Sequence, residues 1–456
     1  MTCPASTFWP VAGHVIGVDV GSQSVKAALL DPDGATVATA GRPCAMRHPR
    51  AGWAEQDPAE WESALAGAVR AVVDAAGIRP GEVTHLGLAC QVDGVVAVDE
   101  RLAPLRDAII WLDRRADAEV DALTGKVGAD AIFETTGLAP DASHTAPKMM
   151  WLRDHEPEVF RAARSLPPVA AYLLARLTGV LAQDHANASS TLLYDVTAGT
   201  WSDLLVAAAG LDPALLPPIR PSNEVAGELL PAAAEFLGLD RGCRVIVGTG
   251  DEHAATLGAG AARPGLVVDV TGTAEPVTAV ADAVVLDPER LVETHAHAVP
   301  GRLLVENPGF VSGGSTLWLA ESVLGVDQSA VFDLAGRAPA GADGVIFLPA
   351  LSGSMAPRWN ENMRGAFTGL AMNHDGHHLA RAVLEGCAFA LRDIVDRLAA
   401  LGLGGEVRVV GGGARSPLWL TIKAGVLGRP VRPVLADEAT ALGGALLAGT
   451  AAGTFS

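Results

Sequence analysis

The first 45 residues alternate between short apolar runs and turn residues, which is the pattern of paired β-strands. Residues 14–20 and 25–30 are apolar runs, and the tetrapeptide Asp31-Pro32-Asp33-Gly34 closes the second one. A third run lies near Val37. The pattern predicts a β-hairpin over residues 14–30 with a third strand beside it.

A helix is predicted after this segment. Asp57 is a suitable N-cap, and Pro58 suits the first helical position because a helix leaves the N–H of that position unpaired. Apolar residues then recur at positions 61, 65, 68, 69 and 72, which is the spacing of one buried helix face. A new strand is predicted over residues 83–89.

A similar pattern returns in the second half of the chain. Residues 266–270 form an apolar run that ends in Thr271-Gly272-Thr273, and they repeat the Val-Asp-Val sequence of residues 18–20. We infer a duplicated domain with a phosphate-binding turn in each half. Two unrelated strands are the open alternative, because three residues can recur by chance. We place the domain boundary directly before Cys243, which divides the chain into residues 1–242 and 243–456.

The composition indicates a compact α/β protein with more than one domain. At 456 residues the chain exceeds the roughly 250–300 residues at which single cores stop growing. It has 49% apolar and 19% charged residues, which excludes a disordered protein. The net charge of −19 opposes binding to nucleic acid or to an anionic membrane. Backbone N–H groups and a metal ion can still bind an anionic nucleotide.

No segment indicates export or membrane insertion. The first 13 residues lack a basic region followed by an apolar one, and no run of 18 apolar residues occurs. The five cysteines have neither a C-x-x-C pair nor zinc-ligand spacing, which fits a reducing compartment. We therefore expect a cytoplasmic protein without a membrane or nucleic-acid partner. The oligomeric state stays open, with a homodimer as one alternative.

The turn after the first strand carries candidates for phosphate and metal binding. Gly21 allows a tight turn, Ser22 and Gln23 offer N–H and side-chain donors, and Lys26 adds a positive charge. Asp19, at the end of the strand, is a candidate to hold Mg²⁺ through water. An ordinary hairpin turn is the alternative interpretation.

Glycine turns follow two strands of the second half. Gly272-Thr273 resembles the first turn, and Gly411-Gly412-Gly413 lies between a predicted strand over residues 406–410 and a helix that begins near Leu418. Three successive glycines let a phosphate or a flat ring approach the backbone closely. The triple glycine is therefore the stronger of the two signals.

Asp251 is the candidate general base. It follows a predicted strand over residues 244–247 and opens an alanine-rich helix over residues 252–262, so it lies at the strand end where open α/β sheets place their sites. N-capping of that helix is the alternative role. Gly248-x-Gly250, with Asp269 further on, also imitates a dinucleotide fingerprint, so an NAD(P)-binding oxidoreductase stays a minor alternative.

Three histidines, His374, His377 and His378, lie close together in the sequence. Clustered histidines can hold a metal. The interpretation we favour is a solvated turn before a helix that begins at Leu379.

These segments together resemble the FGGY carbohydrate kinases. Trp53-Ala-Glu-Gln-Asp-Pro58, followed by Trp61, resembles the specific W-x-E-Q-x-P-x-x-W segment of that family. The other resembling segments are residues 16–26, 110–115, 146–152, 184–189, 347–353, 364–370, 385–391 and 411–416. The resemblance covers nearly the whole chain. Within the family, the motif sequences are most similar to those of the xylulokinases.

The resemblance implies two ribonuclease-H-like domains around a central cleft, as in actin, hexokinase and the heat-shock chaperones. It implies that ATP binds mainly to the C-terminal domain and the sugar mainly to the N-terminal one. Asp251 would be the catalytic base and Asp19 would help to hold Mg²⁺. The residues implied at the nucleotide are Gly272, Thr273, Gly313, Gly412, Gly413 and Ala414.

The chain departs from the xylulokinase pattern in the segments implied to contact the sugar. Gln91-Val92-Asp93-Gly94 stands where Gln-Met-His-Gly is usual, Glu252 replaces an asparagine after the base, and Trp111-Leu112-Asp113 replaces Trp-Asn-Asp. Carboxylates accept hydrogen bonds from hydroxyls and repel acids, so a neutral sugar or polyol is expected and gluconate is disfavoured. D-Xylulose is the leading candidate. Ribulose, erythritol, glycerol and a non-catalytic, nucleotide-gated sugar sensor are the alternatives.

Overall fold

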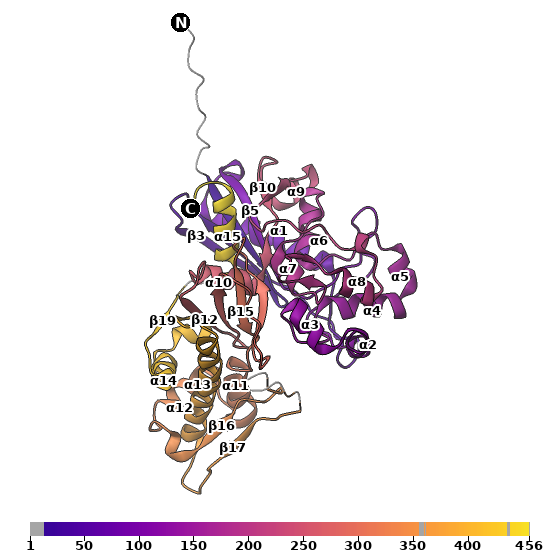
Figure 1. The fold of residues 1–456 in the computed structure, drawn as a ribbon. Coiled ribbons are helices and arrows are strands. Elements are labelled where there is room, and N and C mark those ends of the chain that lie inside the picture. The colour runs from indigo at the N-terminus through magenta and orange to yellow at the C-terminus, as the bar shows by residue number, and fades with distance from the viewer. Residues whose placement is uncertain (1–12, 355–359, 361, 436–437, 456) are drawn as a thin grey trace.

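The computed structural model describes residues 13–354, 360, 362–435 and 438–455. It has two α/β lobes, one above the other in Figure 1, each built around a mixed β-sheet. The first lobe holds the early part of the chain, and the second lobe holds most of the later part. None of the described helices is both long enough and apolar enough to span a membrane.

The first sheet has the order β3-β2-β1-β5-β10-β9. Its strands are β1 (His14–Val20), β2 (Ser24–Leu30), β3 (Thr36–Pro43), β5 (Val83–Cys90), β10 (Arg244–Ile246) and β9 (Val225–Glu228). Strand β2 is antiparallel to both of its neighbours, β1 and β3, and β5 and β10 continue the sheet parallel to β1. The predicted hairpin, third strand and fourth strand are therefore confirmed.

The second sheet repeats this topology. Its order is β14-β15-β13-β12-β18-β19. Its strands are β14 (Glu293–Ala296), β15 (Leu303–Asn307), β13 (Val277–Ala281), β12 (Leu266–Thr271), β18 (Glu406–Gly411) and β19 (Val431–Pro433). Strands β15, β13 and β12 are antiparallel, and β18 and β19 follow parallel to β12. Five strands thus have the same order and direction in both sheets, which supports the inferred duplication.

The first sheet extends past the expected domain boundary. Strand β10 lies after Cys243, yet it pairs with β5, and so does β11 (Thr249–Gly250). The change from one sheet to the other therefore occurs later than we expected, between Gly250 and Leu266. The spacing of the predicted elements along the sequence does not show this position, because a short strand can pair with a strand that lies far away in the sequence.

The last helix returns to the first lobe. Helix α15 (Ala439–Ala451) packs on β1 and β5, beside α10 (Asp251–Gly258), as its yellow ribbon shows in Figure 1. Gly17 makes this packing possible, because a Cβ atom there would clash with the carbonyl of Ala441. The chain therefore crosses between the lobes twice, once after α10 and once before α15.

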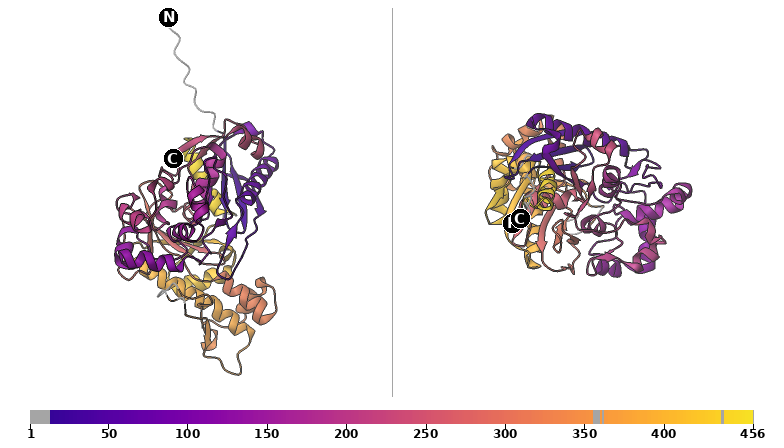
Figure 2. Two further views of the ribbon diagram at one scale, coloured as in Figure 1. Left: turned by 90° about the vertical axis from the view of Figure 1, so that its right-hand side faces the viewer. Right: turned by 90° about the horizontal axis from the view of Figure 1, so that it is seen from above.

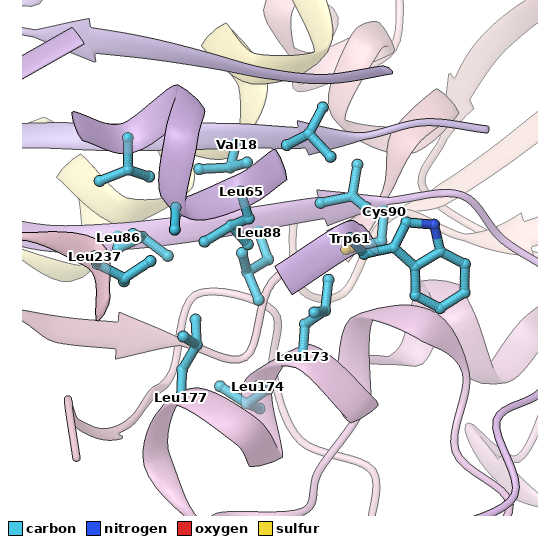
Figure 3. Close-up of a cluster of buried hydrophobic side chains, with 14 of the residues drawn as sticks. Val18, Trp61, Leu65, Leu86, Leu88, Cys90, Leu173, Leu174, Leu177 and Leu237 are labelled. Carbon is cyan, nitrogen blue, oxygen red and sulfur yellow. The ribbon is translucent and has the colours of Figure 1, made fainter. Parts of the chain in front are cut away.

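The core of the first lobe lies between its sheet and three helices. These are α1 (Pro58–Ala76), α6 (Val169–Thr178) and α9 (Pro231–Leu237). Figure 3 shows Trp61 and Leu65 of α1 meeting Leu88 of the sheet and Leu173 of α6. The side chain of Asp57 accepts a hydrogen bond from the N–H of Ala59, which confirms the predicted N-cap of α1.

A group of short helices projects from the side of the first lobe (Figure 2). Helix α7 (His185–Ser189) is not part of this group, because it contacts β11 and β14. The group comprises α2 (Asp117–Val127), α3 (Ala129–Thr136), α4 (Thr145–His155), α5 (Pro157–Ala162) and α8 (Asp203–Ala209), with two small strand pairs: β4 (Glu55–Gln56) with β6 (Ala108–Ile109), and β7 (Tyr194–Asp195) with β8 (Thr200–Trp201). Its separate core includes Met149, Met150 and Leu192.

The second lobe packs its helices on its own sheet. They are α11 (Gly313–Trp318), α12 (Gln328–Ala335), α13 (Gly376–Ala400) and α14 (Pro417–Leu427), with the strand pair β16 (Ile346–Leu348) and β17 (Ala366–Thr368). Helix α13 begins three residues before the expected Leu379, because Asp375 accepts the N–H of His377 and caps it. His377 and His378 therefore belong to the first helical turn, and the solvated-turn interpretation is wrong for these two residues.

Candidate active site

Asp251 and Asp19 lie at the same edge of the first sheet, on either side of β5. Cys90, the last residue of β5, pairs with Val20 of β1 on one side and with Gly250 of β11 on the other. Asp19 directly precedes Val20, and Asp251 directly follows Gly250. The register of three parallel strands therefore carries both carboxylates to one place.

The two carboxylates influence each other. Burial, and then the charge of Asp251, raise the pKa of Asp19 to about 8, against the opposing charge of Lys26. Burial raises the pKa of Asp251 to about 6, against a hydrogen bond of 2.9 Å from the N–H of Glu252 to its Oδ1. A carboxylate with this pKa is ionised at neutral pH and still accepts a proton readily, which suits a general base.

Asp251 does not cap helix α10. Gly250 occupies the N-cap position, and no side chain caps the helix there. The N-capping role is therefore not supported. The dinucleotide-fingerprint alternative is also not supported, because this sheet contains the antiparallel strands β1, β2 and β3, whereas a dinucleotide-binding sheet is mostly parallel. Gly248 has a φ of 81°, and a Cβ atom there would clash with the carbonyl of Leu88.

The segment after β5 lies next to the base. An added Cβ atom on Gly250 would lie 2.6 Å from Cγ1 of Val92, so the side chain of Val92 packs against the backbone of Gly250. Gln91 is buried, and its Nε2 donates to Oε1 of Gln56 at 2.8 Å. Asp93 has a φ of 62°, a left-handed conformation that costs free energy for a residue with a side chain. This conformational strain therefore lies in the segment that contacts Gly250, directly before Asp251.

The carboxylate of Asp93 has basic neighbours. Its Oδ1 lies 3.4 Å from Nδ1 of His144, and its backbone carbonyl accepts from Nζ of Lys148 at 2.7 Å. Although burial opposes the charged form, Asp93 raises the pKa of His144 to about 9. His144 directly precedes α4, and Lys148 lies in its first turn. Nothing in the sequence pattern of that helix indicated that the two residues lie close to Asp93.

Glu252 belongs to an acidic group that the sequence did not reveal. Burial, and then Glu306 and Asp251, raise its pKa well above the ordinary value. Glu293 of β14 and Glu306 of β15 come from the second sheet, and Nε2 of His295 lies 3.3 Å from Oε1 of Glu306. These residues follow no motif, so only the fold brings them near the base.

The structure gives the side chains of Trp111 and Asp113 different surroundings. Trp111 is 40% exposed, which leaves it free to contact a ligand. Asp113 is fully buried, and its oxygens accept hydrogen bonds from Ala54 N and from Nε of Arg115, at 2.6 and 2.8 Å. The geometry therefore gives Asp113 the task of holding its loop in place, and does not support a direct contact with a substrate.

The glycine turns of the second lobe come together at the ends of β12 and β18. The N–H of Gly313 donates to the carbonyl of Gly272 at 3.1 Å, and the N–H of Gly314 donates to that of Thr273 at 3.0 Å. Gly413 lies so close to Thr271 that a Cβ atom would clash with its side chain. Ala414, next to it, is buried. The predicted nucleotide residues of this lobe thus form one group.

The turn of the first lobe is more open. Gly21 has no positive φ, and the nearest atom to an added Cβ would be the carbonyl oxygen of Ser24 at 3.3 Å. Ser22 is partly exposed, and Gln23 is exposed. Nζ of Lys26 forms an ion pair of 2.9 Å with Glu438. A side chain at position 21 would therefore require a small shift of this turn, but no change in its backbone conformation.

Two observations bear on metal binding. In the described part of the chain, no group of three or more His, Cys, Asp or Glu side chains is arranged to hold an ion, and this includes the histidines near α13. Asp19 and Asp251 nevertheless form a pair of mutually repelling carboxylates at the candidate site. Oxygen donors of this kind, completed by water and phosphate oxygens, are what Mg²⁺ binds. The pair fits a metal that arrives with a nucleotide.

The family follows from comparison with known proteins. Residues 14–258 match the N-terminal domain of the FGGY family of carbohydrate kinases, and residues 270–452 match its C-terminal domain. The chain belongs to the FGGY family of carbohydrate kinases. The N-terminal match includes β10, β11 and α10, in agreement with the sheet pairing.

Individual relatives are similar over almost the whole FGGY chain. The xylulose kinase of Escherichia coli is 34% identical over 96% of this chain and 90% of its own length. The glycerol kinase of Thermococcus kodakarensis is 32% identical over 96% of this chain and 88% of its own length. The crystal structure of xylulose kinase from Rhodospirillum rubrum is 31% identical and superposes with a TM-score of 0.87, covering 97% of this chain and 92% of that one. The expected two-domain fold and kinase class are confirmed.

Proposed function

We propose that this kinase transfers the terminal phosphoryl group of ATP to a hydroxyl of a neutral sugar or polyol. The observation that carries the proposal is the position of Asp251, at a strand end beside Asp19 and outside any capping role. A base there takes the proton of the acceptor hydroxyl as its oxygen attacks the phosphorus atom. In the second lobe Gly412 and Gly413 begin a short helical turn, whose first N–H groups have no partner within that turn and would bind the nucleotide phosphates.

Mg²⁺ would be held by Asp19, with Asp251 close by and the remaining ligands from water and phosphate. When bound, the ion neutralises charge on the phosphates. The raised pKa of Asp19 supports this role, since a carboxylate that lacks a sufficient positive neighbour in the protein is stabilised in its charged form by a cation. Lys26 is shared with Glu438 and supplies only part of that charge.

The acceptor we propose first is a pentulose such as D-xylulose, and the xylulose kinase relatives support it. Glycerol or another polyol is the second candidate, because a glycerol kinase is nearly as similar. The carboxyl groups of Asp93, Glu252 and Glu306 can form hydrogen bonds with the hydroxyl groups of an acceptor, and in their ionised form they oppose an acid such as gluconate. A cytoplasmic location and a homodimer stay predictions.

The test is an assay of ADP formation with MgATP and a panel of acceptors. The panel contains D-xylulose, L-xylulose, D-ribulose, L-ribulose, glycerol, erythritol, L-fuculose and gluconate. We expect one neutral acceptor to raise ADP formation well above the acceptor-free rate. A clear preference for gluconate would contradict the proposed acceptor class. ADP formation that no acceptor raises would favour the sugar-sensor alternative.

A further inference from the structure

Lys423 of α14 lies inside the second lobe with its ammonium group surrounded by oxygens. The residue is fully buried. Its Nζ donates to Oδ2 of Asp269 at 2.6 Å, to Oγ1 of Thr271 at 2.6 Å and to Oε1 of Glu275 at 2.9 Å. A lysine has three N–H donors, so all of them are used. The function proposed above assigns this group no role.

Each partner of Lys423 is attached to a predicted nucleotide segment. Asp269 and Thr271 end β12, directly before the turn at Gly272. Oε2 of Glu275 accepts from the hydroxyl of Ser312, the residue before Gly313. Thr271 pairs in register with Gly411 and contacts Gly413. One ammonium group therefore connects the three backbone segments that the site has at this end of the sheet.

We propose that Lys423 is a positioning residue for the nucleotide, which keeps the segments at Gly272, Gly313 and Gly413 at the spacing that the phosphates require. The inference rests on the proposed function and extends it. Backbone donors stabilise a phosphate only when they are already in place, because a shift of about 1 Å can cost roughly 100-fold in rate. A buried ion pair is well suited to hold them, because separating its partners is strongly unfavourable.

The charges in this group are unequal. Asp269 and Glu275 face one lysine, and the buried thiol of Cys387 on α13 also faces Glu275. Burial, and then Asp269, raise the pKa of Glu275 to about 8. Below that pH Glu275 keeps a proton on Oε2, the hydroxyl of Ser312 turns to accept it instead of donating, and the group is neutral. Above it, the group gains a negative charge beneath the bound phosphates, so nucleotide affinity falls as the pH rises through 8.

The first test measures the binding of MgADP by calorimetry, which needs no acceptor and so stands apart from the proposed reaction. Lys423→Met removes the ammonium group, and we expect the Kd for MgADP to rise roughly 10-fold to 100-fold. Ser312→Ala removes one hydroxyl and leaves the buried ion pairs intact, so it folds even where Lys423→Met does not. For it we expect a rise of roughly threefold to tenfold.

A matched control comes from the other lobe. Lys148 of α4 is also fully buried, but its Nζ donates to the backbone carbonyls of Asp93 and Ser143. Lys148→Met should raise the KM for the acceptor and leave the Kd for MgADP within twofold of wild type. If Ser312→Ala folds and binds MgADP like wild type, or if it weakens MgADP and acceptor equally, the positioning role is wrong.

The pH dependence gives a second readout. We expect the Kd for MgADP of the wild type to rise between pH 7 and 9, and that of Glu275→Gln to stay flat, since the amide cannot ionise. Parallel curves for the two proteins would overturn the role of this group. If MgADP binding behaves as expected but no acceptor stimulates ADP formation, the proposed function is contradicted and the positioning role of Lys423 is not.

Discussion

The same tripeptide, Val-Asp-Val, lies near the end of β1 in the first sheet and of β12 in the second, yet its aspartate has a different environment in each lobe. Asp19 lies at the edge of the site, where Asp251 repels it and Lys26 is shared with Glu438. Asp269 is fully buried and paired with Lys423. The difference comes from the helix that packs nearby. Glycine and alanine residues of α15 face β1, whereas α14 brings a lysine to β12. Duplicated strands therefore supply equivalent positions, and the covering helices decide their use.

The largest expected effect concerns the base that Asp19 faces. Asp251→Asn cannot accept a proton, so kcat should fall by roughly 10²–10⁴, while the protein stays folded and binds MgADP. Steady-state rates with the best acceptor of the panel, together with calorimetry, test this. Glu252→Gln is the control, and it should change the KM for the acceptor more than kcat. Acceptor-stimulated activity in Asp251→Asn would refute the assignment.

The two aspartates should respond in opposite ways to the same substitution. Asp269→Asn leaves Lys423 short of a buried partner, so the free energy of unfolding should fall by about 3 kcal/mol. Asp19→Asn removes a carboxylate whose charged form is disfavoured in the fold, so stability should hold or rise, while kcat falls roughly tenfold or more through weaker Mg²⁺ binding. Denaturant unfolding and kcat measured over a range of Mg²⁺ concentrations separate the two. Equal losses of stability would remove the contrast.

Alanine substitution should affect stability more at Gly413, in the second lobe, than at Gly21, in the first. Gly413→Ala places a methyl group against the side chain of Thr271, so unfolding should become easier by about 1–3 kcal/mol and MgADP binding should weaken. Gly21→Ala places its methyl group 3.3 Å from the carbonyl oxygen of Ser24, a milder contact that a small shift of the turn relieves, so it should melt only slightly below wild type. Any loss of ATP affinity in Gly21→Ala then reports a phosphate close to that turn. Thermal melts and the KM for ATP are the measurements.

The smallest effect is expected at Lys26. Its side chain is 39% exposed and pairs with Glu438, so Lys26→Ala should change stability by about 0–1 kcal/mol. If its charge also reaches the nucleotide, the KM for ATP should rise a few fold at low salt and less at high salt. A KM for ATP unchanged at both salt concentrations would confine Lys26 to the ion pair with Glu438.

The sequence by itself determined the local elements and the residues with a recognisable spacing. The alternation around Val18, the Asp57 cap and the glycines at 411–413 predict their structures because each depends on neighbours within a few residues. Asp251 was identified in the same way, by its place between a strand and a helix. The family resemblance rests on such short segments and needs no knowledge of distant contacts.

Only the tertiary structure decided which distant residues share an environment. It placed β10 on the first sheet, returned α15 to the first lobe, buried Asp113 against Arg115 and gave Asp269 its partner 154 residues away. No local period or cap encodes these contacts, because they depend on how helices pack on sheets after the elements have formed. The sequence shows which side chains can ionise. Their burial and their partners decide their pKa values and their roles, and both are properties of the folded chain.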